Sequence, residues 1–305
     1  MHSPISSPSL VEATRTTPAE RQNSQRSRSG LYPASESGVV RPIVRWAGGK
    51  RWLLPTLRDL VAKTTAHNLI EPFLGGAASA LGLGSFQRME LADLNGELVA
   101  MYKAVRDQPD QVFATYSAWQ NTSDQYYSLR EESSKEPVRA AARFLYLNHT
   151  SFNGIYRVNR QGKYNVPYGR RPNLTLPTHD HLKAASQRLK CAALEVGDFE
   201  IAINKAMAGD FLFIDPPYTV AHNNNGFIKY NQHLFSFDDQ IRLAKSIARA
   251  IDRGAYFALT NAAHSSIRET FGHLGRIVEL DRKNTVGGVA AERGRTSELL
   301  FTNIA

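Results

Sequence analysis

The chain has 305 residues with 42% hydrophobic content, enough for one large core or for a core with an inserted lobe. Its formal net charge of +9 favours a polyanionic partner, either nucleic acid or an acidic membrane surface. No apolar run approaches the ~20 residues of a membrane span. The single cysteine, Cys191, excludes an internal disulfide and a multi-thiolate metal site, so we expect a cytoplasmic protein.

Residues 1–40 are rich in Ser, Pro, Thr, Arg and Gln and show almost no apolar periodicity. Such a segment cannot bury enough surface to offset the loss of chain entropy, so we expect a disordered tail. A transit peptide is less well supported, because Glu12, Glu20 and Glu36 interrupt the basic character of such peptides.

Two glycine turns follow the tail. Residues 43–50 (IVRWAGGK) lead through two glycines to a helix-like segment. Residues 69–76 (LIEPFLGG) predict a strand that enters a glycine turn, where a ligand can approach the backbone closely. A second strand ends on Asp93, 18 residues after Gly75, where a carboxylate can accept hydrogen bonds from ribose hydroxyls. The alternative is that residues 93–96 form a simple polar turn.

A long segment of different character follows. Residues 97–147 have a helical pattern, and residues 155–166 predict a β-hairpin with its turn at 160–162. Basic and aromatic residues interleave on and beside this hairpin, an arrangement that suits phosphate contact, base-edge readout and stacking. The alternative is a solvated hairpin packed by its tyrosines.

Residues 210–218 combine a buried strand with a polar end. The apolar run FLFI at 211–214 predicts a strand buried on both faces, and it stops at the tetrapeptide DPPY. Ligands bind at the carboxyl ends of strands in open α/β sheets. The two prolines make the backbone rigid and leave bare carbonyls beside the carboxylate and the phenol. The alternative is a proline-rich turn with an N-capping Asp.

The remaining segments alternate between apolar and helical patterns. Strands are expected at 194–196, 256–259, 279–282 and 299–302, and helices at 200–208 and 237–250, the latter with Ser236 as N-cap. This alternation predicts an α/β fold with a mostly parallel sheet and helices on both faces. We interpret His179 and His181 as part of a solvated loop, not as a metal site.

Ordered motifs identify a family. With WAGGK at 46–50, EPFLGG at 71–76, Asp93, SFNG at 151–154, NVPYG at 165–169 and DPPY at 215–218, the chain resembles Dam-type (D12 class, alpha-group) adenine-specific DNA methyltransferases. The resemblance runs from about Val44 to the C-terminus. It implies a Rossmann-like S-adenosylmethionine-dependent catalytic domain at 41–96 and 179–305, with an inserted DNA target-recognition domain at 97–178.

The resemblance also implies site residues. The tetrapeptide Asp215, Pro216, Pro217 and Tyr218 would be catalytic. The site for S-adenosylmethionine would comprise Trp46, Lys50, Phe73, Gly75, Asp93, Asp198, Phe199 and Asp215. Candidate DNA contacts are Arg45, Phe152, Asn153, Arg157, Arg160, Lys163, Arg170 and Arg171, with Arg157 at the position of a guanine contact. Arg45 and residues 149–152 depart from GATC-methylating relatives, which leaves the target sequence open.

The chemistry of an adenine amino group explains the tetrapeptide. Its lone pair is conjugated into the ring, and hydrogen bonds to Asp215 and to the Pro216 carbonyl would localise that pair toward the methyl donor. The base must leave the duplex to be reached, and Tyr218 would stack on it. Stacking needs the ring of Tyr218 and not its hydroxyl.

Other functions fit less well. A zinc-dependent base deaminase needs a Pro-Cys-x-x-Cys segment, and a dinucleotide oxidoreductase needs a G-x-G-x-x-G turn, and both are missing. Cytosine-N4 or RNA adenine methylation, or a non-catalytic DNA-binding module, remain alternatives. We expect double-stranded DNA as partner, no metal, no membrane and a monomer, and leave a restriction endonuclease in the same system open.

Overall fold

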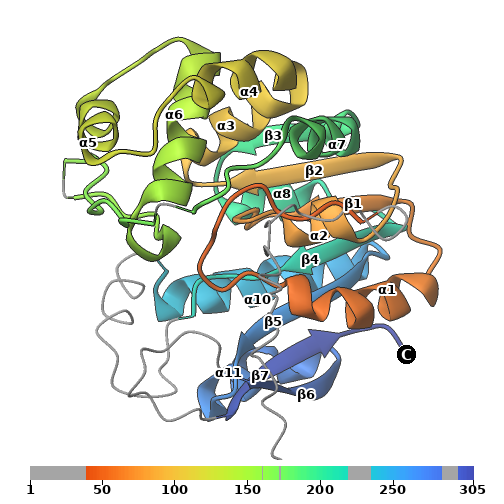
Figure 1. Ribbon diagram of the computed structural model, residues 1–305. Helices are drawn as coiled ribbons and strands as arrows, with labels where there is room; N and C mark the ends of the chain where they lie inside the picture. Colours follow the sequence, from red (N-terminus) through yellow and green to blue (C-terminus); the bar gives the residue numbers. More distant parts are fainter. Residues whose placement is uncertain (1–38, 160, 172, 219–234, 284–294) are drawn as a thin grey trace, which may run out of the picture. The chain divides into compact units, whose positions relative to one another are not determined.

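The computed structural model describes residues 39–159, 161–171, 173–218, 235–283 and 295–305 (Figure 1). Almost all of the predicted tail at 1–40 lies outside these residues, as does Arg160. The described residues form a seven-stranded sheet with helices on both faces. The predicted α/β architecture is therefore confirmed.

The sheet has the strand order β3-β2-β1-β4-β5-β7-β6. Its strands are β1 (Asn68–Glu71), β2 (Arg88–Asp93), β3 (Ala192–Val196), β4 (Asp210–Ile214), β5 (Tyr256–Ala262), β6 (Arg276–Lys283) and β7 (Arg295–Thr302). Neighbouring strands run parallel except β7, which is antiparallel to both β5 and β6. Strands β2 and β3 are added in turn on one side of β1, and the chain then crosses over to form β4 on the other side of β1. This reversal is the topological switch point at which such sheets bind ligands.

Helices cover the two faces unequally. The described helices are α1 (Leu54–Ala62), α2 (Ala78–Gly82), α3 (Gly96–Asp107), α4 (Pro109–Ser117), α5 (Ser123–Glu131), α6 (Pro137–Thr150), α7 (His179–Leu189), α8 (Phe199–Asn204), α10 (Phe237–Asp252) and α11 (Ser265–Phe271). Helices α8, α10 and α11 pack on one face, and α1, α2, α3 and α7 on the other (Figure 1). The predicted cap of α10 is confirmed, because Ser236 and Asp239 form a capping box.

The apolar run of β4 is explained by burial on both sides. Phe211 and Phe213 point into the core with α1, α3 and α7, whereas Leu212 and Ile214 point into the core with α8, α10 and α11. Because successive strand residues face opposite sides, a central parallel strand needs apolar residues at every position. The run then ends where the sheet opens to solvent.

The inserted segment starts on the sheet and extends away from it. Helix α3 packs on β2 and β3 and also on α6, and α4, α5 and α6 lie together at the upper left of Figure 1. The predicted hairpin is confirmed as a short antiparallel pairing: Val158 bridges Tyr164, and the Asn159 N–H donates to the Lys163 carbonyl at 2.8 Å. The division into catalytic and recognition domains stays a prediction.

One local prediction is wrong. His179 and His181 do not lie in a loop but in the first turn of α7, which Thr178 caps. The His179 ring lies 2.6 Å from a carboxylate oxygen of Asp110, and the His181 ring lies 2.9 Å from the Arg41 carbonyl. The Thr-x-x-His spacing carried a capping signal that the interpretation overlooked. Within the described ranges, no helix is long and apolar enough to cross a membrane.

Candidate active site

The tetrapeptide begins directly after β4, beside the switch point. A single oxygen of Asp215, Oδ1, is bound twice: the Lys50 ammonium lies 2.9 Å away and the Thr260 hydroxyl donates to it at 2.7 Å. Thr260 belongs to β5, the neighbour of β4, and Lys50 comes from the WAGGK segment. The Lys50 side chain is only 4% exposed and the Asp215 side chain 20%. The carboxylate is thus fixed through one oxygen.

Tyr218 is anchored through its hydroxyl. The hydroxyl donates to Oε2 of Glu298 at 2.9 Å, and the Lys50 ammonium lies 4.9 Å from the centroid of the tyrosine ring. Glu298 also lies 3.6 Å from the Lys50 ammonium. Glu298 is a β7 residue that the sequence did not single out, although a carboxylate just before the buried run at 299–301 was a signal.

Burial and ion pairing have opposite effects on the pKa of Asp215. Burial raises the pKa of Asp215, whereas the Lys50 ion pair and the Thr260 hydrogen bond lower it. A desolvated carboxylate is costly to ionise without a cation at hand. Lys50, assigned from the resemblance to the cofactor, therefore has a direct electrostatic effect on the Asp215 carboxylate.

The glycine turn after β1 contacts Asp93 directly. Gly75 has φ +45°, and its N–H donates to Oδ2 of Asp93 at 2.9 Å, while the Asn95 N–H donates to Oδ1 at 2.9 Å. A Cβ on Gly75 would stand 2.9 Å from Cδ1 of Trp46. Both the backbone conformation and the close indole require glycine here. Burial raises the pKa of Asp93.

Glu71, at the end of β1, is a second carboxyl group that the sequence interpretation missed. It is 2% exposed, and burial raises its pKa to about 8. The charges of Asp215 and Asp93 push in the same direction, so Glu71 lies within electrostatic reach of both. Within the described part of the chain its Oε2 atom has no hydrogen-bond partner. A buried polar atom of this kind is suited to a ligand.

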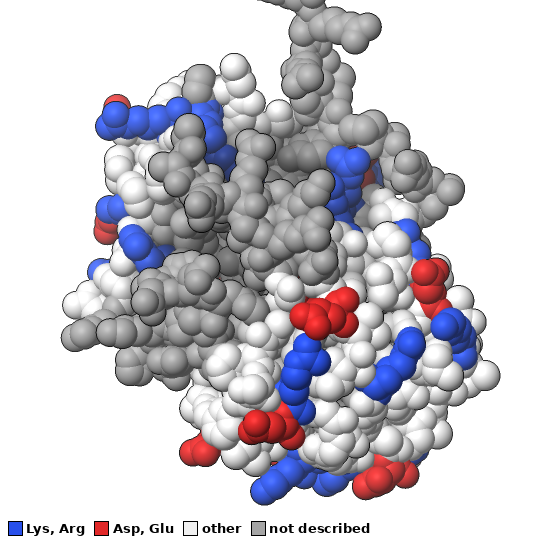
Figure 2. Space-filling model, turned by 90° about the horizontal axis from the view of Figure 1, so that it is seen from below, with Lys and Arg blue, Asp and Glu red and all other residues white. Residues whose placement is uncertain are grey.

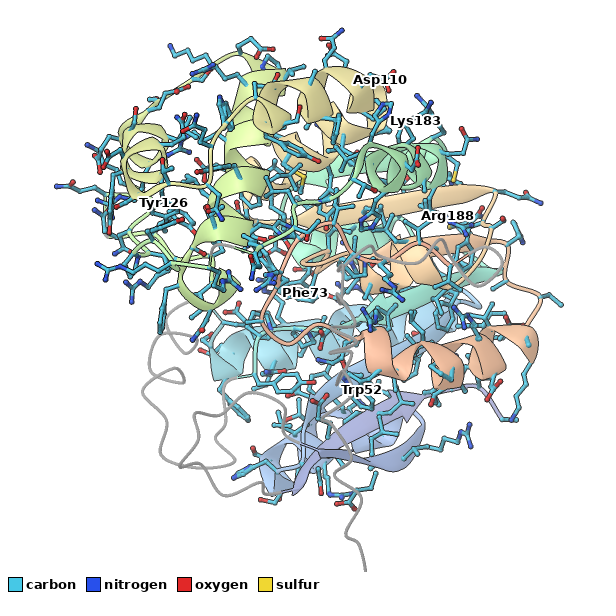
Figure 3. The ribbon with its side chains drawn as sticks, viewed as in Figure 1. Trp52, Phe73, Asp110, Tyr126, Lys183 and Arg188 are labelled. Carbon is cyan, nitrogen blue, oxygen red and sulfur yellow. The ribbon has the colours of Figure 1, made fainter. Side chains whose placement is uncertain are left out.

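Asp198 and Phe199 form a separate group with Phe73. Asp198 caps α8 and accepts two hydrogen bonds from the Arg242 guanidinium, at 2.6 and 2.9 Å. Phe199 stacks on Phe73 with ring centroids 5.5 Å apart, and Phe73 also meets Phe235 edge-on. Phe73 is labelled near the centre of Figure 3, beside the sheet. Phe199 is 3% exposed and has the Arg242 guanidinium over its ring, so Phe73, which is half-buried, is the ring of this pair with surface that a ligand can reach.

The predicted DNA contacts divide into outward and inward side chains. Phe152 is 53% exposed, and Asn153, Arg157, Lys163 and Arg170 are exposed too. The Arg157 guanidinium is oriented by Asn165, whose Oδ1 accepts from its Nε at 2.8 Å.

Arg171 differs from this outward group. Its guanidinium donates to the carbonyls of His149 and Ser151, at 2.7 and 2.9 Å. These bonds connect the chain at Arg171 to the end of α6. Its half-buried position suits a structural contact better than a phosphate contact. Arg45 is also half-buried, and its backbone N–H and carbonyl are both bonded to the Asn148 side chain.

Trp46 contacts both the glycine turn after β1 and the hairpin at 155–166. Its indole covers Gly75 on one side and stacks on Tyr156, at a centroid distance of 5.5 Å, on the other. Tyr156 directly precedes Arg157 in the hairpin. The glycine turn, predicted for the cofactor, and the hairpin, predicted for DNA, therefore both contact the Trp46 indole.

Comparison with known proteins identifies the family. A family model described as D12 class N6 adenine-specific DNA methyltransferase matches residues 46–286. The chain belongs to this family. The predicted family and enzymatic activity, transfer of a methyl group to adenine in DNA, are thereby confirmed, and the sheet is that of a Rossmann-like methyltransferase.

Named relatives span nearly the same length as this D12-class chain. It is 32% identical over 274 residues to the type II methyltransferase M1.LlaDCHI of Lactococcus lactis subsp. cremoris, covering 87% of this chain and 95% of the relative. It is 34% identical over 247 residues to the type II methyltransferase M.MjaIII of Methanocaldococcus jannaschii, covering 73% and 84%. The DNA adenine methylase of Escherichia coli K12 is 27% identical over 266 residues, covering 85% and 94%.

Proposed function

We propose that this methyltransferase transfers the methyl group of S-adenosylmethionine to the N6 amino group of an adenine flipped out of double-stranded DNA, with residues 215–218 as the catalytic segment. The observation that supports this most strongly is the state of Asp215. It stands at the carboxyl end of β4, at the switch point, with Oδ1 fixed by Lys50 and Thr260. The other oxygen, Oδ2, is the atom that we assign to the substrate.

The residues around the switch point fit S-adenosylmethionine. Gly75 has no side chain to hinder a ligand at the turn after β1, and the Asp93 carboxylate oxygens, already fixed by Gly75 and Asn95, can accept from ribose hydroxyls. Phe73, which is half-buried and backed by the buried Phe199, is the ring that would contact the adenine. The unpartnered Oε2 of Glu71 suits the amino group of the methionine portion. Bound at these residues, the cofactor supplies a methyl group activated by its sulfonium charge.

The protein would act chiefly by orientation. Asp215 Oδ2 and the Pro216 carbonyl accept hydrogen bonds from the target amino group and turn its lone pair toward the methyl group. As the new N–C bond formed, the bond from the methyl carbon to the sulfonium sulfur would break and leave a neutral thioether, and the proton lost by the amino group could pass to Asp215 along the existing hydrogen bond. The raised pKa of this buried carboxylate improves it as an acceptor. Tyr218 supports the flipped base by stacking.

The exposed basic residues of the hairpin support the proposal that the partner is duplex DNA. Arg157, Lys163 and Arg170 are exposed on the segment that follows α6. A companion restriction endonuclease is supported only by the names of two relatives, both type II methyltransferases. A monomeric state, independence from metal ions and a cytoplasmic location stay predictions.

Modified-base sequencing tests this function. The full chain is expressed in cells that lack adenine methylation, and their DNA is sequenced by a method that reports N6-methyladenine with its context. We expect methylation at one short motif with the wild-type protein and none with Asp215→Ala, which should still bind DNA because the carboxylate does not contact phosphates. Methylated cytosine, or equal methylation by Asp215→Ala, would contradict the proposal.

A further inference from the structure

Glu298 is a buried carboxylate to which the mechanism above gives no part. It lies on β7 opposite Ala262 of β5 and Leu280 of β6, and its side chain is 5% exposed. The next three residues of the strand, at 299–301, are buried and apolar. A charge in such a position costs free energy unless partners compensate for the loss of water. Its partners are therefore informative.

Two partners of Glu298 belong to the proposed catalytic group. Its Oε2 atom accepts the hydrogen bond of the Tyr218 hydroxyl at 2.9 Å and lies 3.6 Å from the Lys50 ammonium. The same ammonium lies 2.9 Å from Oδ1 of Asp215 and is further held by the Gly48 carbonyl at 2.9 Å. One carboxylate thus contacts both the aromatic platform and the cation that binds the catalytic carboxylate.

These contacts fix the two groups that would face the target base. The Tyr218 ring is attached at its Cβ and, through the hydroxyl, at Glu298, so its long axis has little freedom to swing. Lys50 and Thr260 occupy Oδ1 of Asp215, which directs Oδ2 to the substrate. Catalytic groups need this kind of support, because small displacements of a reacting geometry lower rates strongly.

We propose that Glu298 is a positioning residue for methyl transfer, acting on the ring of Tyr218 through its hydroxyl and on Asp215 through Lys50. This inference rests on the function proposed above. The sequence led us to expect that only the ring of Tyr218 matters. If its hydroxyl holds the ring in place, Tyr218→Phe should lower kcat.

A set of four variants separates positioning from folding. Glu298→Ala removes both contacts, Glu298→Gln keeps an oxygen that can accept from Tyr218 but loses the charge, and Tyr218→Phe removes only the hydroxyl. The double variant Tyr218→Phe with Glu298→Ala closes the cycle. Asp210→Asn is a matched control, since Asp210 is a 1% exposed carboxylate at the opposite end of β4.

Each protein is assayed with tritiated S-adenosylmethionine and plasmid DNA from methylation-deficient cells, and its affinities for cofactor and DNA are measured separately. We expect Glu298→Ala to lower kcat about 10-fold to 100-fold, the loss from removing a hydrogen bond to a charged group, while both affinities stay within about twofold. Glu298→Gln should recover part of the loss. The double variant should be no slower than Glu298→Ala alone, because the Tyr218 hydroxyl then has no anchor to lose.

Unchanged kcat in Glu298→Ala would overturn the inference, and so would multiplicative losses in the double variant. An equal loss of kcat in Asp210→Asn would also overturn it, since the effect would then belong to any buried carboxylate of the sheet. If Glu298→Ala does not fold, Tyr218→Phe is assayed alone, and an unchanged kcat in that variant would overturn the inference. Absence of transfer by the wild-type protein would instead refute the proposed function, and the inference with it.

Discussion

At the scale of single residues, the site is marked by a group of buried or half-buried acidic side chains. Asp215, Asp93, Glu71 and Glu298 are at least partly buried around the switch point, and Lys50 contacts two of them. Motifs predicted Asp215 and Asp93, because each follows a recognisable strand. Glu298 belongs to no motif, and its contacts bring together β7, the segment after β4 and the segment at 46–50, which the local sequence does not encode. The role of Glu71 inside its motif depends on burial, which likewise appears only in the fold.

The pKa of Glu71 leads to a stability prediction. Below its ordinary value of 4.5 the carboxyl is protonated in both the folded and the unfolded chain; between 4.5 and about 8 only the folded chain holds the proton. Folding stability should therefore fall as pH rises through this window, by up to about 1.4 kcal/mol per pH unit. Glu71→Gln keeps a neutral side chain and should lose this slope.

Urea unfolding of wild-type protein and Glu71→Gln, at several pH values between about 5 and about 8, measures the difference. The gap between the two unfolding free energies should widen in favour of Glu71→Gln toward the alkaline end. Parallel curves would mean that Glu71 is ionised in the folded protein.

At the scale of elements, we expect the hairpin after α6 to separate the reading of DNA sequence from general DNA affinity. Arg157 has its guanidinium oriented by Asn165, as a bidentate contact to a guanine requires, whereas Lys163 is exposed near the turn. Arg157→Ala should relax specificity at one base pair, by about 1–3 kcal/mol of discrimination. Lys163→Ala should weaken all sequences alike and reduce the salt slope of binding by about one.

A library of single-base variants of the preferred site, methylated at two salt concentrations, measures both effects. A uniform loss of activity in Arg157→Ala with unchanged preference would remove the hairpin from target reading. Specificity would then have to be sought at Arg45 and Phe152, where the sequence departs from GATC-methylating relatives.

Helices and strands were predicted better than the connections between them. The strand at 211–214 and the helix capped by Ser236 follow from periodicity and capping chemistry, which are local. The inward turn of Arg171 could not be foreseen, because it depends on carbonyls left free at the end of α6. Side-chain direction in an irregular segment is set by such tertiary partners, so composition alone gave an outward arginine.

At the scale of the whole molecule, alternation of strands and helices was enough to predict a mostly parallel sheet with helices on both faces. It did not give the order of β5, β7 and β6, since an antiparallel pair at a sheet edge has no distinct local signal. The net charge of +9 indicated a polyanion but not its docking face. On the face shown in Figure 2, basic and acidic side chains lie interspersed, so this visible surface is not a uniformly basic patch.

The central claim is that the segment at 215–218 directs a methyl group to the amino nitrogen of adenine. It is tested most directly by incubating the purified chain with S-adenosylmethionine labelled in the methyl group and with duplex DNA, then digesting the DNA to nucleosides and separating them. With the wild-type protein the label should appear in N6-methyl-2′-deoxyadenosine. With Asp215→Ala it should vanish, although that variant retains its DNA affinity. Label in N4-methylcytosine, or undiminished label in adenine with Asp215→Ala, would contradict the claim.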